Sequence, residues 1–128
     1  MEFFKIIDIQ TTGEDIQQHI TVDRLDEFCS NLFILREESE QITVGSIWGE
    51  FSFFSLKIKG GLRMGLLDCP NAVSWTITTG YPPTEDKVVL HLTINRTEKG
   101  AEFISEIQGF MEDWEVGMIK QFKSLLIE

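Results

Sequence analysis

The sequence contains few of the residues on which disulfide-rich, metal-binding and membrane-spanning proteins depend. It has two cysteines and two histidines in 128 residues. Two cysteines are too few for a disulfide framework, and no HxH, HExxH or CxxC spacing indicates a metal site. No apolar run approaches the roughly 20 residues that a membrane-spanning helix needs. We therefore expect a cytoplasmic protein with reduced thiols and with neither a metal nor a cofactor.

Basic residues are also scarce. Twenty-one acidic residues stand against eleven basic ones, so the formal net charge is −10 at pH 7. A surface of that sign repels the phosphates of nucleic acids and the headgroups of anionic lipids, so neither nucleic acid nor a membrane surface is an expected partner. The first ten residues, MEFFKIIDIQ, lack the basic start and the cleavage site of a signal peptide, which agrees with a cytoplasmic location.

Large apolar residues are abundant. Hydrophobic residues make up 42% of the chain, with ten Phe and three Trp against only three Pro. A chain of this length is the size of one domain, and folding can bury about two-thirds of its extended surface. No stretch has the composition of a linker. We therefore expect residues 1–128 to form a single domain.

Alternation of apolar and polar residues predicts a sheet of about six to seven strands. Residues 3–10 form a short apolar run typical of a buried strand, and residues 15–22 alternate strictly, which predicts a half-exposed strand. Further strands are predicted at 42–48, 50–59, 62–66, 73–78 and 88–95. The pair Gly60-Gly61 predicts a tight hairpin, because glycine adopts positive φ without strain. The charged stretch REESEQ (36–41) predicts a loop.

Two segments have the period of an amphipathic helix. Apolar residues from Leu25 onward recur three and four positions apart, which predicts one short helix near residues 23–35. The same period runs from Ala101 to the end of the chain and predicts one long helix of about 40 Å. Gly109 and Gly117 weaken it by about 1 kcal/mol each relative to Ala, so either packing on the sheet compensates or the glycines permit a close approach. The predicted fold is α+β, an antiparallel sheet packed against a long C-terminal helix.

The order of these elements resembles that of a known superfamily. A strand and short helix (HITVDRLDEFCSNLF), a run of antiparallel strands and a terminal helix follow one another as in START-like helix-grip proteins. The segment DWEVGMIKQFKSLL (113–126) resembles the Trp-containing C-terminal helix of the subgroup related to activators of a heat-shock chaperone ATPase. The resemblance implies a cavity between sheet and helix that holds a small apolar molecule, and it transfers no catalytic residue.

Apolar residues on two predicted strands and the long helix are candidates for lining such a cavity. Ligand pockets are mostly apolar with few polar groups, although the same side chains could equally fill a solid core. The candidate lining residues are Trp75, Ile77, Leu92, Phe110 and Trp114.

Three basic residues gather around the predicted hairpin of an otherwise acidic chain. Lys57, Lys59 and Arg63 are candidates for binding a small anion or an acidic patch on a protein partner. Basic side chains on an exposed hairpin also protect a sheet edge from aggregation, so a purely structural role is the competing interpretation.

No motif commits the chain to a reaction. We expect a non-enzymatic domain of helix-grip type that binds a small hydrophobic ligand or a protein partner. The alternative is a protein interaction module, or a homodimer, that holds no ligand. A hydrolase-like enzyme that uses His91 with Cys69 or a nearby carboxylate is the third hypothesis, since a general base needs a partner within hydrogen-bond reach.

Overall fold

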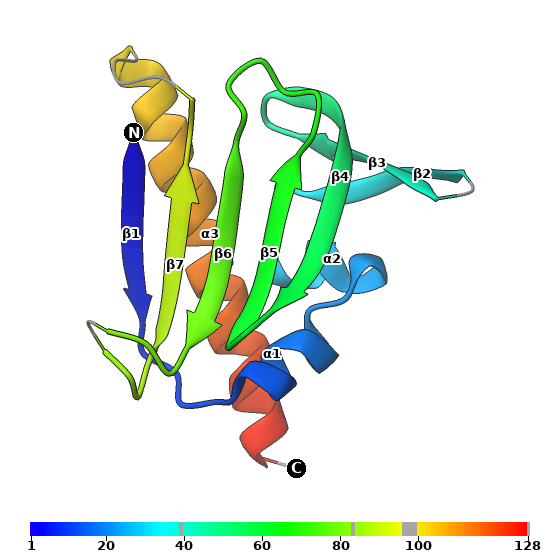
Figure 1. Ribbon diagram of the computed structural model, residues 1–128. Coiled ribbons are helices and arrows are strands. Elements are labelled where there is room, and N and C mark those ends of the chain that lie inside the picture. The colour runs from blue at the N-terminus through cyan, green and yellow to red at the C-terminus, as the bar shows by residue number, and fades with distance from the viewer. Residues whose placement is uncertain (39, 83, 96–99, 128) are drawn as a thin grey trace.

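A seven-stranded antiparallel sheet with one long helix across one of its faces forms the body of the protein (Figure 1). The computed structural model describes residues 1–38, 40–82, 84–95 and 100–127, of which 124–127 are described by their backbone only. The strands in this part of the chain are β1 (Glu2–Ile7), β2 (Phe33–Glu38), β3 (Gln41–Ser46), β4 (Gly49–Ile58), β5 (Gly61–Leu66), β6 (Ser74–Thr79) and β7 (Val88–Thr93). The predicted fold class is confirmed.

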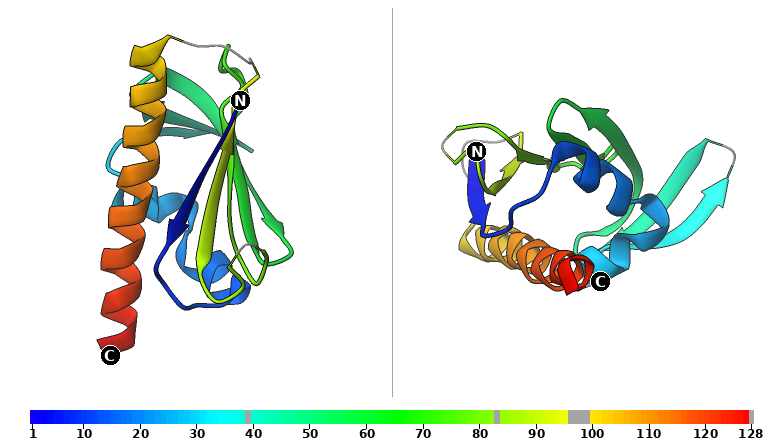
Figure 2. Two further views of the ribbon diagram at one scale, coloured as in Figure 1. Left: turned by 90° about the vertical axis from the view of Figure 1, so that its left-hand side faces the viewer. Right: turned by 90° about the horizontal axis from the view of Figure 1, so that it is seen from below.

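The sheet order follows the chain, with one exception. From one edge to the other the strands run β1-β7-β6-β5-β4-β3-β2, so β1 pairs with the last strand and every other pair is consecutive in sequence. Within the described residues β1 and β2 are the two edges. Figure 2 shows the sheet curving, with the long helix α3 (Ala101–Ile127) along its concave side.

The prediction of a strand at residues 15–22 is wrong, because this segment begins with the helix α1 (Gly13–His19). The Thr12 hydroxyl caps that helix by accepting a hydrogen bond from the backbone N–H of Asp15 at 3.1 Å. Ile16 and Ile20 are both buried. Their spacing of four places them on one helix face as readily as on one strand face, so alternation alone could not distinguish the two structures.

The short helix predicted near residues 23–35 is much shorter than its apolar pattern suggests. It consists of one 3₁₀ turn, η1 (Val22–Arg24), followed by α2 (Leu25–Phe28). It ends because Cys29 has an extended backbone, with φ −144° and ψ 110°. The described part of the REESEQ stretch is not a loop as predicted, because Arg36 to Glu38 belong to β2 and Gln41 begins β3, with which β2 pairs. Strand β2 pairs with β3 at the edge of the sheet opposite to β1.

The apolar stripe of α3 packs on the sheet as predicted. The stripe residues with described and buried side chains are Ile107, Phe110, Met111, Trp114, Met118 and Phe122; those of Leu125 and Leu126 lie outside the described residues. None of the helices in the described part of the chain has an apolar stretch that could cross a membrane. One strand, short helices, six strands and a terminal helix form an order consistent with a helix-grip-like arrangement.

Candidate functional site

The five candidate pocket residues are all buried in the interior, and the three aromatic ones form ring contacts. Trp75, Ile77, Leu92, Phe110 and Trp114 are each at most 1% exposed. The Trp75 ring meets Phe110 edge-on with a centroid separation of 5.0 Å, and it lies 6.1 Å from the Trp114 ring. These are the separations of packed aromatic pairs. The region between β6 and α3 is therefore occupied by side chains of the protein itself.

Three buried indole groups in this region lack a hydrogen-bond acceptor. The Nε1 atoms of Trp48, Trp75 and Trp114 have no partner among the described residues. An unpaired buried donor costs about 1–3 kcal/mol. An apolar ligand beside these rings would offer no acceptor to the three N–H groups. The unpaired N–H groups therefore do not support the expectation that a small apolar molecule binds between sheet and helix.

The opposite, convex face of the sheet carries a row of side chains that is open to solvent. No helix of the described residues lies over strands β1 and β4 to β7 on this side (Figure 1), which we term the outer face. Strand register aligns one residue from each of five adjacent strands into the central row, namely Phe4, His91, Thr76, Arg63 and Leu56. The two ends of the row are apolar, with Phe4 63% and Leu56 56% exposed.

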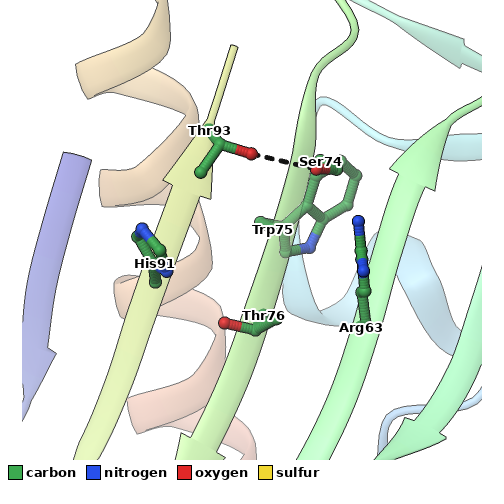
Figure 3. A pocket seen from close by; sticks show the side chains of 6 residues that line it. All are labelled: Arg63, Ser74, Trp75, Thr76, His91 and Thr93. Carbon is green, nitrogen blue, oxygen red and sulfur yellow. Dashed lines mark hydrogen bonds between the residues drawn. The ribbon is translucent and has the colours of Figure 1, made fainter. Parts of the chain in front are cut away.

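A depression of about 220 Å³ lies at the middle of the outer face (Figure 3). Its walls come from three neighbouring strands, β5, β6 and β7. The hydroxyl oxygens of Ser74 and Thr93 are 3.1 Å apart and share one hydrogen bond. The lining residues are Arg63, Ser74, Trp75, Thr76, His91 and Thr93.

The two basic side chains of the depression differ in their surroundings. His91 is held in place: its Nε2 is 3.1 Å from a carboxylate oxygen of Glu2, and its ring stacks on Phe4 with a centroid separation of 4.3 Å. Arg63 has no ion pair with any described carboxylate. The guanidinium of Arg63 can therefore donate hydrogen bonds to an oxyanion without competition from a described carboxylate.

The three basic candidates from the sequence do not form one cluster. Lys57 is the register partner of the buried Leu62 and so belongs to the face of the sheet opposite to Arg63. Lys59 lies in the β4–β5 turn, where its carbonyl oxygen accepts a hydrogen bond from the Tyr81 hydroxyl at 3.0 Å. The structure places Arg63 beside polar residues of β6 and β7 instead, a grouping that sequence reasoning missed. The register of the β4–β5 hairpin could have shown only that Lys57 and Arg63 lie on opposite faces.

The residues of the enzymatic hypothesis lie in different environments. His91 stands on the open outer face, whereas Cys69 is buried in the turn between β5 and β6. The only described side chain that forms a polar contact with His91 is Glu2. No described hydroxyl or thiol therefore forms the hydrogen bond to His91 through which the imidazole could activate it as a nucleophile. Burial raises the pKa of the Cys29 thiol to about 12, which disfavours the reactive thiolate. The described residues contain no group of three potential metal ligands.

Comparison with protein-family models, with curated proteins and with solved structures finds no match for this chain. The likeness to helix-grip proteins therefore depends on element order and on the position of α3. Function has to be inferred from the chain's own side chains.

Proposed function

We propose that the protein is a non-enzymatic binding domain of helix-grip type whose outer face binds a segment of another protein. The central row of that face carries the proposal, because it combines exposed apolar side chains at both ends with Arg63, which has no ion pair to a described carboxylate. Exposed apolar groups rimmed by polar ones are typical of interaction surfaces. Most of the binding free energy at such surfaces comes from a few large side chains, including arginine.

The dimensions of the row suit a short extended segment. Phe4 and Leu56 stand on strands four intervals apart in the sheet, which corresponds to about 19 Å at a spacing of about 4.8 Å per strand. An extended chain covers that distance in about six residues. A partner segment with an apolar residue near each end can therefore contact Phe4 and Leu56 together.

The packed interior favours binding of a protein partner over carriage of a small apolar ligand. The Trp75 ring contacts the rings of Phe110 and Trp114 between sheet and helix, whereas a carrier needs room there for its ligand. Pairing of the outer face with a second copy is less favourable. Two chains of net charge −10 repel one another, and two-fold pairing brings Arg63 toward the same basic region of the partner.

A display library of random twelve-residue peptides tests the proposal, because such a library samples many partner segments at once. The full chain is the bait, and selected peptides are measured against Phe4→Ser and Leu56→Ser. We expect peptides with two apolar residues flanking an acidic one, and roughly tenfold weaker binding to either variant, equivalent to about 1.4 kcal/mol. Val116→Ser is the matched control, because Val116 is an equally exposed apolar residue on α3.

Three results would count against a binding role for the outer face. The first is that selected peptides bind Phe4→Ser and Leu56→Ser as tightly as the unsubstituted chain. The second is that Val116→Ser weakens binding as much as they do. The third is a dimer at micromolar concentration in sedimentation that Leu56→Ser dissociates, which would assign the face to self-association instead.

A further inference from the structure

We infer that the depression at the centre of the outer face is an oxyanion site, in which Arg63 holds a carboxylate or phosphate group with help from Thr76, His91 and the Ser74–Thr93 pair. This inference rests on the proposed function. It specifies the chemical group that the partner segment places between its two apolar residues.

The register of three strands brings the candidate ligand-binding groups together. Arg63, Thr76 and His91 are directly opposite one another on β5, β6 and β7, and register partners on adjacent strands share a face of the sheet. Two strand intervals amount to about 10 Å, so one small anion can lie within reach of all three side chains. Figure 3 shows the Arg63 side chain extending along its strand toward Ser74.

The volume of the depression fits a small anionic group. It measures about 220 Å³, which is far more than the roughly 10–15 Å³ that one water molecule needs on the same measure. Its lining residues belong to three strands of the sheet (Figure 3), and no helix of the described residues covers the sheet on that side (Figure 1). A carboxylate or phosphate on a side chain can therefore enter without any rearrangement of the described backbone.

The donors match the oxygen atoms of such a group. The planar guanidinium of Arg63 presents two parallel N–H groups, the geometry that binds carboxylate and phosphate through two oxygens. Ser74 and Thr93 use one hydroxyl hydrogen for the bond between them, so the hydrogen of the accepting hydroxyl remains available to a ligand. Thr76 adds a third hydroxyl at the same level of the sheet.

The nearby acidic group does not occupy the site. Glu2 is the register partner of Thr93 at the edge of the sheet, and its carboxylate is engaged by His91. The described ion pairs of the protein are elsewhere on its surface or involve this same Glu2. Arg63 therefore faces the depression with its charge uncompensated by a described carboxylate.

An NMR titration of the full chain tests the site with two defined probes, sodium phosphate and sodium acetate, at constant ionic strength in chloride. We expect saturable shifts of the Arg63 Nε–H signal and of the Thr76 and His91 amides in at least one of the two salts. Arg63→Gln should weaken the interaction by about tenfold, as expected for loss of a charge-assisted hydrogen-bonded pair. Lys57→Gln, which removes the same charge from the opposite face, should leave the dissociation constant within about twofold.

The two salts separate the possible sources of the group. Preference for phosphate indicates a phosphorylated partner residue, and preference for acetate indicates an aspartate or glutamate. The site is refuted if neither salt produces saturable shifts at these residues, or if Arg63→Gln and Lys57→Gln respond alike. Arg63→Lys provides a further check, because it keeps the charge but loses the forked geometry and should bind with intermediate affinity.

Failure of the oxyanion site is distinguishable from failure of the proposed function. If selected peptides bind Phe4→Ser and Leu56→Ser weakly but bind Arg63→Gln normally, the proposed partner-binding face stands and the oxyanion site is refuted. If phosphate or acetate binds saturably at Arg63 but the selected peptides bind Phe4→Ser and Leu56→Ser as tightly as the unsubstituted chain, the oxyanion site stands and the partner-binding face is refuted.

Discussion

The backbone of α3 at Gly117 lies directly against the carbonyl oxygen of Phe28 in α2, so close that a Cβ atom at position 117 would overlap that oxygen. One turn earlier on α3, the Asp113 carboxylate accepts a hydrogen bond from the Asn31 side chain. The first contact holds α2 against α3, and the second holds the segment that follows α2. They also explain why a residue of low helix propensity stands in the middle of α3.

Replacement of the two central glycines of α3 should therefore have opposite effects. Gly117→Ala forces α2 away from α3, and we expect a loss of about 1–3 kcal/mol in the free energy of unfolding, as for overpacked interiors. Gly109→Ala is the matched control, because a Cβ there meets nothing within 4 Å, and it should gain up to about 1 kcal/mol from helix propensity. Urea denaturation measures both. Equal effects of the two substitutions would contradict the close contact.

The aromatic cluster between sheet and helix should behave as a filled core. We expect Trp75→Ala and Phe110→Ala each to lower the free energy of unfolding by about 3–5 kcal/mol. A double-mutant cycle between them should show a coupling of about 0.5–1.5 kcal/mol from the edge-to-face contact. Leu56→Ala, on the outer face, should stay within about 0.5 kcal/mol. A cost below about 1 kcal/mol for Phe110→Ala would instead indicate a hollow interior.

The elements predicted correctly from the sequence are those whose pattern fits only one structure. Strand β6 alternates between buried and half-buried residues over all six positions, and β7 alternates from Leu90 to Thr93. The stripe of α3 has helical spacing at its buried positions from Ile107 to Phe122. The segment at 15–22 failed because Ile16 and Ile20 satisfy both periods. The hydroxyl of Thr12 three residues before Asp15 was the local signal for a helix start.

The candidate site was only partly predictable for a related reason. Parity along a strand identifies which residues share a face, but the partners on neighbouring strands depend on register. Arg63 was singled out with Lys57, although the pairing of Lys57 with Leu62 places these two charges on opposite faces. The neighbours that matter, Thr76 and His91, lie on strands distant in sequence, so their proximity follows from sheet topology and not from any local pattern.

The cap of α1 offers a direct test of the corrected assignment. Thr12→Ala removes the acceptor for the Asp15 N–H, and we expect it to lower the free energy of unfolding by about 1 kcal/mol. Thr12→Ser keeps the hydroxyl and should restore most of the loss. Urea denaturation of the two variants gives the comparison, and an indifferent response to Thr12→Ala would argue against a capped helix at residues 13–19.

Stability should fall at alkaline pH in a way that depends on Cys29. Its pKa is raised from 9.0 to about 12, first because burial desolvates the thiolate. The folded protein therefore holds the thiol proton more tightly than the unfolded chain. The contribution of Cys29 to the free energy of unfolding is complete below pH 9.0 and is lost as the pH rises toward 12. Unfolding free energies of the unsubstituted chain and of Cys29→Ala should accordingly converge as the pH is raised from about 8 to about 10.5. Parallel curves would show that Cys29 does not contribute.

Reaction with iodoacetamide at about pH 8 provides an independent readout of the same thiol. Cys29 should be alkylated slowly in the folded protein and rapidly in urea, because only the unfolded chain exposes a thiol of ordinary reactivity. Peptide mapping separates its modification from that of Cys69. Fast alkylation of Cys29 in the native protein would contradict its burial.

The pairing of the first strand with the last has a consequence for how the protein is made. Strand β1 leaves the ribosome long before β7, the strand with which it pairs. The paired side chains of Glu2 and His91 are 89 residues apart in sequence. At a translation rate of about 5–20 residues per second, β1 waits about 4–18 seconds before its partner exists. During that interval the apolar strand has no sheet to join, so nascent chains should depend on a holding chaperone more than the finished protein does.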